Sequence, residues 1–491
     1  LEGMSLCVHN SKPLFAWLDR MGGEARVSYD AMLAAYLLNP NASDYSLKRL
    51  QEEAGTAAPK LENETAWQAA VLPRVKNWQA ASLLANGQQK LLEEMEIPLA
   101  QVLARMENIG FLVDGESIRV YGERLETEIE ALQKQIYEEV GYEFNINSPK
   151  QLGDALFVKL GLPSGKKTKT GYSTNAEILE KLRYDHPAVE LVLHYRTLTK
   201  LKSTYCEGML KVIGPDGRIH SNFNQTETRT GRISSTEPNL QNIPVRTELG
   251  RELRKFFLAK EGWVLVDADY SQIELRVAAQ ISGDSRMKSA CQKGEDLHAL
   301  TASLISNVPI SQVTKAQRQA AKAVNFGLIF GMGAEGLRQY SSQSYGVDMT
   351  LEEAEQFRSA FFQNYHGINW WHHDLRESHP LEGRTLTGRR FLFTPDTGLA
   401  DLANTPVQGT AADILKHALG LLASRIRESD KKIVGIVHDE ILMEVPEEEV
   451  DDAVVLLKNT MEEAARAILP DVPCEADAKA ADSWAGKSKT P

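Results

Sequence analysis

Acidic residues inside two apolar, strand-like stretches constrain the fold of this chain more than any other feature. The stretch "KKIVGIVHDEILMEVP" (431–446) is rich in β-branched residues, yet Asp439 and two further polar residues lie at its centre. In "WVLVDADY" (263–270), Asp267 and Asp269 share one face of a strand by alternation. Burying an ionised carboxylate without a partner is strongly unfavourable. The sequence therefore predicts that these acids face a cation.

The two stretches predict a metal site if they pair in one sheet. Asp269 and Asp439 would then face one another, and two close carboxylates repel strongly unless a proton or a cation intervenes. Oxygen ligands without cysteine favour Mg²⁺. The alternative is that each acid caps backbone amides, which is the more frequent situation for a single Asp in a strand. Two such strands together favour the metal site.

A helix predicted at 314–333 has the residue types that bind a nucleoside triphosphate. Arg318, Lys322, Phe326 and Phe330 repeat every four residues and form a stripe along one helical face. The two cations suit phosphates, and an aromatic ring suits a sugar and base. A core helix whose two basic residues reach solvent is the alternative. The glycines of "GMGAEG" come after a helix and not a strand, so we expect them to end the helix and to bind no dinucleotide.

The charge pattern favours a local basic track and not a basic surface. The net charge is −12, whereas proteins that bind nucleic acid without sequence preference are often basic overall. Three basic clusters nevertheless occur, in "SGKKTKTG", "YRTLTKLKSTY" and "GRELRKFF". The first contains Lys166, Lys167 and Lys169, in a loop punctuated by glycine and serine. Each cluster alone would be a solvated face, but the three together indicate a charged track.

The length and composition predict a globular protein of several domains. A chain of 491 residues is too long for one hydrophobic core, so we expect about two to four domains. No apolar run is long enough to span a membrane, and no secretory leader is visible. The four cysteines lie far apart, which fits a reducing cytosol and argues against a zinc cluster. Since the first residue is Leu, we expect a fragment of a longer protein.

Hydrophobic periodicity predicts that most of the remaining chain is helical. A long amphipathic helix is expected over 116–140, ending at Gly141. Further helices are expected at 188–205, over most of 284–345 and at 399–428. The pattern therefore combines a few buried strands with many helices.

Four stretches carry a resemblance to a known family. They are "TRTGRISSTEPNLQNIPVRT" (228–247), "DADYSQIELRVAAQISGD" (267–284), "RQAAKAVNFGLIFG" (318–331) and "VHDEI" (437–441). Together, in this order and spacing, they resemble the large fragment of bacterial family A DNA polymerases, and the likeness runs from about residue 95 to residue 485.

The resemblance implies an α/β (α+β) right-hand polymerase fold of palm, thumb and fingers, after a partial ribonuclease H-like domain. The implied domains are, in chain order, a partial and inactive 3′–5′ exonuclease-like domain at 1–95, the start of the palm and the thumb at 96–215, the palm with the first metal aspartate at 216–283, the fingers at 284–394, and the palm with the second metal aspartate at 395–491.

The resemblance also implies roles for individual residues. Asp269 and Asp439 resemble the two aspartates that hold two Mg²⁺ ions, and the carbonyl of Tyr270 would complete the coordination shell. Glu440 is similar to the adjacent helper acid, and Lys322 to a catalytic cation. The implied nucleotide-binding residues are Arg318, Lys322, Phe326, Phe330, His298, Glu274 and Gln272. The implied DNA-binding residues are Arg232, Asn239, Gln241, Asn404, Gln408, His438, Lys166, Lys167 and Lys169.

The implied function is template-directed addition of deoxynucleotides to a primer 3′ end, in DNA replication and repair. The partners would be primer–template DNA and dNTPs, and we expect a monomer in the bacterial cytoplasm at the nucleoid, without a membrane. One alternative is a polymerase of the same fold that copies RNA or uses ribonucleotides, which Glu274 beneath the incoming sugar would disfavour. Another is a catalytically dead DNA-binding scaffold. Retention of the metal aspartates and the triphosphate cations argues against it.

The sequence departs from the family pattern in two places. Phe330 stands where the family usually has Tyr. Residues 1–95 contain no Asp-x-Glu, and Leu14 or a neighbour stands where an acid is expected. A two-metal exonuclease needs several carboxylates to hold its ions. We therefore expect no proofreading.

Overall fold

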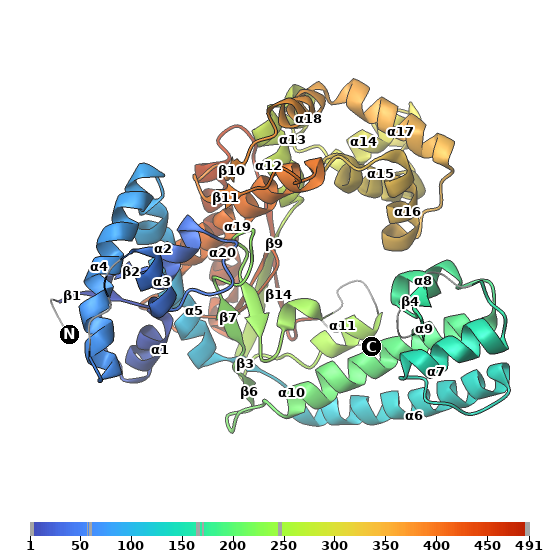
Figure 1. The fold of residues 1–491 in the computed structure, drawn as a ribbon, viewed down its shortest axis with the longest axis horizontal. Helices are drawn as coiled ribbons and strands as arrows, with labels where there is room; N and C mark the ends of the chain where they lie inside the picture. Colours follow the sequence, from blue (N-terminus) through green and yellow to red (C-terminus); the bar gives the residue numbers. More distant parts are fainter. Residues whose placement is uncertain are drawn as a thin grey trace.

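The computed structural model describes residues 4–55, 57, 61–163, 167–168, 171–243 and 248–486, with only the backbone at 167–168. A central sheet is flanked on one side by an N-terminal unit (Figure 1). Two helical bodies extend from the other side, one built around α6 (Gly115–Val140) and α9 (Pro187–Lys200), the other around α15 (Lys315–Leu328). No helix among the described residues is both long enough and apolar enough to cross a membrane.

The central sheet pairs the two acidic strands, as the sequence predicts. Its order is β12-β13-β9-β14, and all neighbours are antiparallel. The strands are β12 (Lys432–Val437), β13 (Glu440–Pro446), β9 (Trp263–Tyr270) and β14 (Ala476–Ala481). Alternate residues of β9 enter two different hydrophobic cores, Val266 one and Leu265 the other. The sheet is therefore covered on both faces, and its acidic end is held rigidly.

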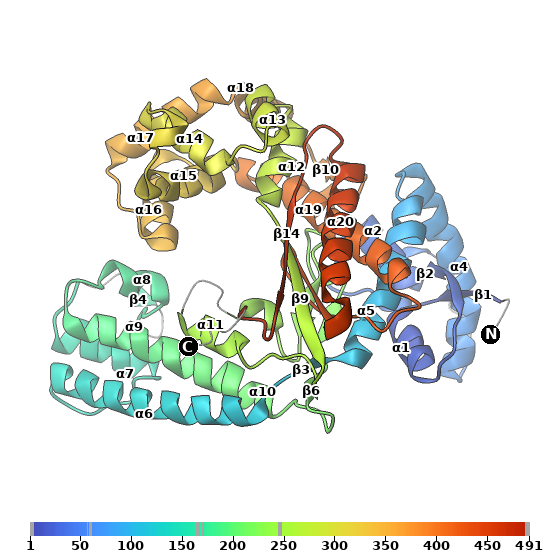
Figure 2. The same cartoon turned by 180° about the vertical axis from the view of Figure 1, so that it is seen from behind.

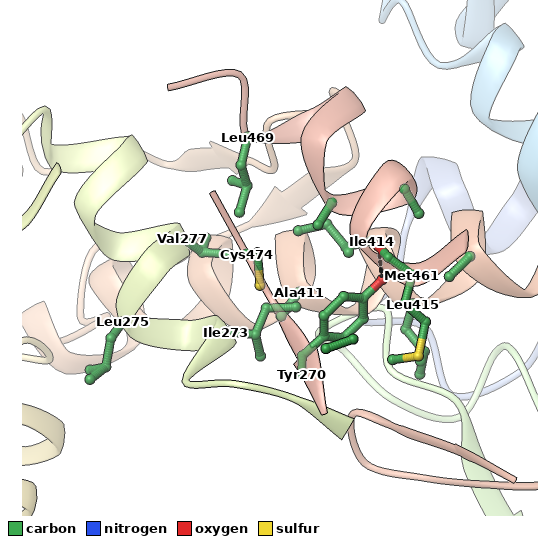
Figure 3. Packing of buried hydrophobic residues seen from close by; sticks show 14 of the residues in the cluster. Tyr270, Ile273, Leu275, Val277, Ala411, Ile414, Leu415, Met461, Leu469 and Cys474 are labelled. Carbon is green, nitrogen blue, oxygen red and sulfur yellow. Dashed lines mark hydrogen bonds between the residues drawn. The ribbon is translucent and has the colours of Figure 1, made fainter. Parts of the chain in front are cut away.

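Three helices cover one face of the sheet: α12 (Ile273–Ser282), α19 (Leu399–Arg425) and α20 (Val450–Ile468). Figure 2 shows α20 running beside β9 and β14. The side chain of Tyr270 points into this core, where its hydroxyl donates a 2.7 Å hydrogen bond to the Met461 carbonyl (Figure 3). Only the backbone of Tyr270 remains available to the acidic end of β9.

The N-terminal unit is a small layered structure that precedes the sheet in the chain. It contains β1 (Ser5–Val8), α1 (Lys12–Arg20), β2 (Arg26–Asp30), α2 (Ala31–Leu38), α3 (Leu47–Glu53), α4 (Glu64–Ala85) and the π-helical turn η1 (Leu91–Glu96). Strands β1 and β2 pair in parallel. The helix α5 (Ile97–Ile109) then leads to the sheet and packs against α19 and β12.

The body around α6 and α9 confirms the predicted long amphipathic helix. Helix α6 ends at Gly141, whose φ of 90° suits glycine, and buries Ile118, Leu125 and Ile136. Its remaining elements are α7 (Pro149–Gly153), η2 (Asp154–Lys159), β4 (Lys167–Thr168), β5 (Gly171–Tyr172), α8 (Ala176–Lys181), η3 (Leu201–Glu207) and α10 (Gly208–Leu210). Two segments join this body to the sheet. Before α6 lies β3 (Phe111–Leu112), and after α10 come β6 (Arg218–Ile219), β7 (Asn222–Asn224), β8 (Ser234–Thr236), η4 (Leu240–Asn242) and α11 (Glu248–Arg254).

The second helical body lies between β9 and α19 in the chain. It contains α13 (Ser285–Gln292), α14 (Leu297–Ser306), η5 (Ile310–Gln312), α16 (Ala334–Tyr345), α17 (Leu351–Asn364), α18 (His366–Ser378), β10 (Glu382–Arg384) and β11 (Arg390–Leu392). Gly331 and Gly333 of "GMGAEG" separate α15 from α16, with a φ of 79° at Gly331, whereas Gly336 lies inside α16. The prediction that they end the helix is confirmed. Helix α15 stops at Leu328, however, so Phe330 lies beyond the helical stripe on which it was expected.

Candidate active site

A two-residue turn places Asp439 beside the acidic end of β9. Strand β12 ends at Val437 and β13 begins at Glu440, so His438 and Asp439 form the connection. His438 adopts a φ of 56°, which is the left-handed conformation that tight hairpin turns require. Such backbone strain in a residue other than glycine is concentrated at functional sites. In the register, Glu440 lies opposite Asp269.

Mutual repulsion and burial disfavour the charged form of these acids. Burial among protein atoms and the neighbouring Asp439 carboxylate raise the pKa of Asp269 to about 6, although one side of Asp269 faces solvent. Burial also raises the pKa of Asp439. Burial and the adjacent Asp267 raise the pKa of Glu440 to about 8. Asp267 itself has a buried carboxylate oxygen that finds no hydrogen-bond partner in the described structure.

Two cations from distant parts of the chain only partly offset this negative charge. The Arg254 guanidinium lies 4.2 Å from the centre of the Trp484 ring, and its charge acts on Glu440 and Asp267. The Trp484 indole donates a 3.2 Å hydrogen bond to Glu440. Lys479 on β14 lies opposite Asp267, with its Nζ 3.3 Å from the carboxylate. The site therefore still favours a further cation.

The donor set fits Mg²⁺. Asp269 and Asp439 provide hard carboxylate oxygens, and the backbone of Tyr270 lies directly after Asp269. Among the described residues, no group of three or more His, Cys, Asp or Glu side chains is arranged to hold a metal ion. A metal at this pair would thus need oxygens from the backbone, from water or from a bound phosphate.

A cavity of about 170 Å³ opens beside Asp439 and is lined by Thr228, Arg232, Gln241 and His438. Arg232 reaches from this cavity to α12, where its guanidinium donates a 2.6 Å hydrogen bond to Glu274. The structure therefore brings together residues from three of the motif stretches, 228–247, 267–284 and 437–441.

Asn239 is close in sequence to Gln241, which lines this cavity. Its side chain has a structural role. Its side-chain oxygen caps the short helix η4 by accepting a hydrogen bond from the backbone of Gln241. The Gln241 side chain in turn donates a 2.9 Å hydrogen bond to the Ile233 carbonyl. Contact with DNA by these two residues stays a prediction.

Helix α19 contributes the two amides that the sequence singled out. Asn404 and Gln408 are half-buried, one turn apart, and the side-chain oxygen of Asn404 lacks a hydrogen-bond partner among the described residues. Gly409 allows the close packing next to them, because a Cβ there would lie 2.5 Å from the Phe391 ring and 3.0 Å from the Thr230 carbonyl. The helix is thus pressed against the loop that carries Arg232.

The nucleotide-side residues converge on Asp296, which the sequence analysis missed. Asp296 caps α14 through the backbone of His298, and it accepts a 2.7 Å hydrogen bond from Arg318 on α15. The Gln272 amide, at the start of α12, lies 3.4 Å from the same carboxylate. The stretch "EDLHALTA" (295–302) contains a signal for this role, since an Asp before a helical run is a common N-cap.

Burial disfavours the charged form of His298, and contact between this residue and a triphosphate stays a prediction. Burial lowers its pKa to about 4, and its Nδ1 accepts a 3.0 Å hydrogen bond from the Asn325 amide. The Phe326 ring lies 5.7 Å from the His298 ring. Lys322 lies between Arg318 and Phe326 along the half-exposed face of α15, so the predicted order of charge and ring is present on the helix.

The basic clusters have different outcomes. Lys166 and Lys169 lie outside the described residues, and for Lys167 only the backbone in β4 is described. Lys202, in the second cluster, pairs with Glu126 and Glu207 at 2.6 and 2.5 Å. In the third cluster Arg254 turns inward to the carboxylates, so that cluster is not a uniform solvated face. No pattern in the sequence indicates which basic residue of this third cluster is buried.

Asp30, a buried acid of the N-terminal unit, has a structural role. Asp30 is fully buried and accepts hydrogen bonds from the backbone N–H groups of Asn10, Ser11, Met32 and Leu33. It thereby caps α2 and fixes the loop after β1. An acid whose oxygens are occupied in this way has little capacity left for a metal.

Comparison with known proteins places this geometry in a family. The model of DNA polymerase family A matches residues 116–486. The chain is 40% identical to the DNA polymerase I of Geobacillus stearothermophilus over 493 residues, covering 93% of this chain and 55% of that protein. It is also 40% identical to the thermostable DNA polymerase I of Thermus thermophilus, with the same two coverages. The chain spans about half the length of these curated relatives.

A solved structure agrees over almost the whole chain. The POL domain of Pol1 from M. smegmatis, in complex with DNA primer–template and dNTP, superposes with a TM-score of 0.88 at 34% identity. The match covers 98% of this chain and 86% of that one, and therefore includes the N-terminal unit.

Proposed function

This chain belongs to DNA polymerase family A, and on that premise we propose that it extends a DNA primer by template-directed addition of deoxynucleotides. The observation that carries the proposal is the pairing of β9 with β13, which sets Asp269 beside Asp439 at the end of a rigid sheet. The sheet with α12, α19 and α20 corresponds to the palm. The body around α6 and α9 corresponds to the thumb, and that around α15 to the fingers.

The acidic pair would hold two Mg²⁺ ions together with the carbonyl of Tyr270. When bound, the ions would lower the pKa of the primer 3′-hydroxyl and stabilise the leaving pyrophosphate. The chain supplies the fixed carboxylates, and their raised pKa values support the proposal that a cation binds there. Glu440 lies next to them as a helper acid, tied to Trp484.

The cations of α15 would receive the triphosphate. Arg318 is held by Asp296, so a phosphate must compete with this carboxylate for the guanidinium. Lys322 lies one turn further along the helix and would neutralise charge that develops on the pyrophosphate. Phe326, and Phe330 beyond the helix, would meet the sugar and base, with the neutral His298 as a hydrogen-bonding partner.

The cavity beside Asp439 would receive the primer terminus. Arg232 and His438 line it, and Asn404 and Gln408 present amides from α19. Minor-groove acceptors occur in every base pair, so such donors test the shape of a pair without reading its sequence. That property suits an enzyme that copies any template.

A primer-extension assay with the purified chain tests the proposed function. We expect full-length products with dNTPs on a DNA template, little product with NTPs, and products whose sequence follows the template. A mispaired, 5′-labelled primer incubated with Mg²⁺ and no nucleotide should stay full length, because the N-terminal unit would not proofread. Absence of dNTP-dependent extension would refute the polymerase proposal and favour a DNA-binding scaffold.

Glu274 would exclude ribonucleotides by packing beneath the sugar. We expect Glu274→Ala to raise ribonucleotide incorporation on the order of tenfold or more, because a clash with a 2′-hydroxyl costs a few kcal/mol. Glu274→Gln keeps the volume and a hydrogen-bond acceptor for Arg232, so it should stay selective. The ratio of rNTP to dNTP incorporation by each variant measures the effect. Equal ratios in the wild type and the Ala variant would refute this placement of Glu274.

A further inference from the structure

Two hydroxyl groups connect the N-terminal unit to Arg232. Tyr36, on α2, is 1% exposed, and its hydroxyl donates a 2.8 Å hydrogen bond to the Thr228 carbonyl. The Thr228 hydroxyl donates a 2.7 Å hydrogen bond to the Arg232 carbonyl. Arg232 then pairs with Glu274 and lines the cavity beside Asp439. A continuous chain of contacts thus runs from the N-terminal unit to the catalytic end of the sheet.

A buried arginine also packs against the same loop. Gly231 has a φ of 87°, and a Cβ there would lie 2.9 Å from the side chain of Arg389. Arg389 is fixed by hydrogen bonds of 2.8 Å to Asp413 and 2.5 Å to Glu96, and all three side chains are almost fully buried. Tyr36 and Arg389 together therefore hold the backbone before Arg232 in place.

We propose that Tyr36 is a positioning residue for the primer terminus, acting through Thr228 on the backbone of Arg232. The N-terminal unit then contributes to the accuracy of extension and not to stability alone. This inference rests on the proposed polymerase function. It adds to that function a residue far from the reacting atoms, on an element that precedes the polymerase motifs.

The physical reason is that the position of the Arg232 guanidinium, at the end of a long side chain, depends on the position of the Arg232 backbone. A functional group must be held close to its productive position by supporting contacts, and small misplacements reduce the rate strongly. Burial raises the pKa of the Tyr36 hydroxyl far above neutrality, so it stays a donor. Removing this hydroxyl leaves the Thr228 carbonyl without that support, while the ring continues to fill the core.

The test compares Tyr36→Phe with Tyr45→Phe in the full chain. Tyr45 belongs to the same unit and packs edge-on against the Tyr36 ring, and its hydroxyl also donates a 2.8 Å hydrogen bond to a carbonyl, that of Asn39 at the end of α2. Single-turnover extension is measured from a matched and from a mispaired primer end. We expect Tyr36→Phe to lower the matched-to-mispaired rate ratio about fivefold, the scale of one hydrogen bond. Tyr45→Phe should leave the ratio unchanged, and both variants should unfold at similar temperatures.

A double-mutant cycle separates positioning from general loosening. In an Arg232→Ala background, Tyr36→Phe should have no further effect on the ratio, because the residue that it positions is gone. Thr228→Val, which removes the second hydroxyl and keeps the shape, should reproduce the effect of Tyr36→Phe. An active wild type whose ratio Tyr36→Phe does not change would overturn this inference alone. A wild type that extends no primer would overturn the proposed function, and this inference with it.

Discussion

Replacing Asp269 or Asp439 by Asn should abolish primer extension while leaving the affinity for primer–template nearly unchanged. Each substitution keeps the shape of the side chain and removes a charge from the pair at the end of β9 and β13. Metal-ion stabilisation of the transition state is worth several kcal/mol, and about 1.4 kcal/mol corresponds to a factor of ten. We therefore expect a loss on the order of a thousandfold in the rate of single-nucleotide addition.

Asp477→Asn is the matched control for this prediction. Asp477 on β14 also lies opposite Asp269 in the register, and its carboxylate accepts a 2.8 Å hydrogen bond from Ser271. Loss of this surface acid should leave extension close to the wild-type rate. Primer–template affinity, measured by fluorescence anisotropy, should be similar for all the variants. Substantial extension by Asp269→Asn, or equal losses in all three variants, would contradict the assignment.

The second large effect concerns a buried charge network that ties the N-terminal unit to α19. Glu96 is fully buried and pairs with Lys416 at 2.7 Å and with Arg389 at 2.5 Å. Burial opposes ionisation of Glu96, but the charges of Lys416 and Arg389 outweigh it and bring its pKa to about 2. Glu96→Ala would leave two buried cations facing only Asp413. We expect it to lower the free energy of unfolding by about 3–5 kcal/mol.

The double variant Glu96→Gln with Lys416→Met provides the control. Removing one partner of a buried pair strands the other charge, whereas removing both often costs little. The double variant should thus be more stable than Glu96→Ala in urea unfolding. The wild type should also lose stability as the pH falls from about 4.5 towards 2, since the folded state keeps Glu96 ionised longer than the unfolded chain. A Glu96→Ala protein as stable as the wild type would contradict this account.

Patterns local in sequence predicted well the part of the site that β9 and β13 form with their acidic residues. The β9–β13 pairing followed from two apolar runs interrupted by acids, because burial leaves such acids few alternatives. The long helix α6 and its end at Gly141 followed from periodicity and a terminal glycine. The "HDE" triplet carried no glycine or proline to announce a turn, and yet a two-residue turn forms there with His438 at positive φ. Tertiary pairing of the flanking strands imposes that turn.

The residues that the sequence did not reveal act over long chain separations. Arg254 on α11, and Lys479 and Trp484 in or just after β14, act on Glu440 and Asp267, and no local pattern marks this role. Asp296 had a cap signal, but its contact with Arg318 depends on how α14 packs against α15. The predicted stripe on α15 included Phe330, but the helix ends at Leu328 and Phe330 lies beyond it. Burial, which sequence spacing does not show, makes His298 neutral.

The most direct test of the central claim, that Asp269 and Asp439 form a cation site, is thermal unfolding at pH 7.5 with and without Mg²⁺. The folded state raises the pKa of Asp269 to about 6 from 3.8, so ionisation at pH 7.5 destabilises the metal-free fold. Because this carboxylate is partly exposed, we take the effect as about 1 kcal/mol, or roughly 1 °C for a chain of 491 residues.

Metal-free Asp269→Asn should therefore unfold at a higher temperature than the metal-free wild type, and the difference should shrink as the pH falls from about 6 towards 3.8. Mg²⁺ should raise the unfolding temperature of the wild type by binding to its folded state, and should do little for the variant. An equal Mg²⁺-dependent rise in both proteins would contradict the claim.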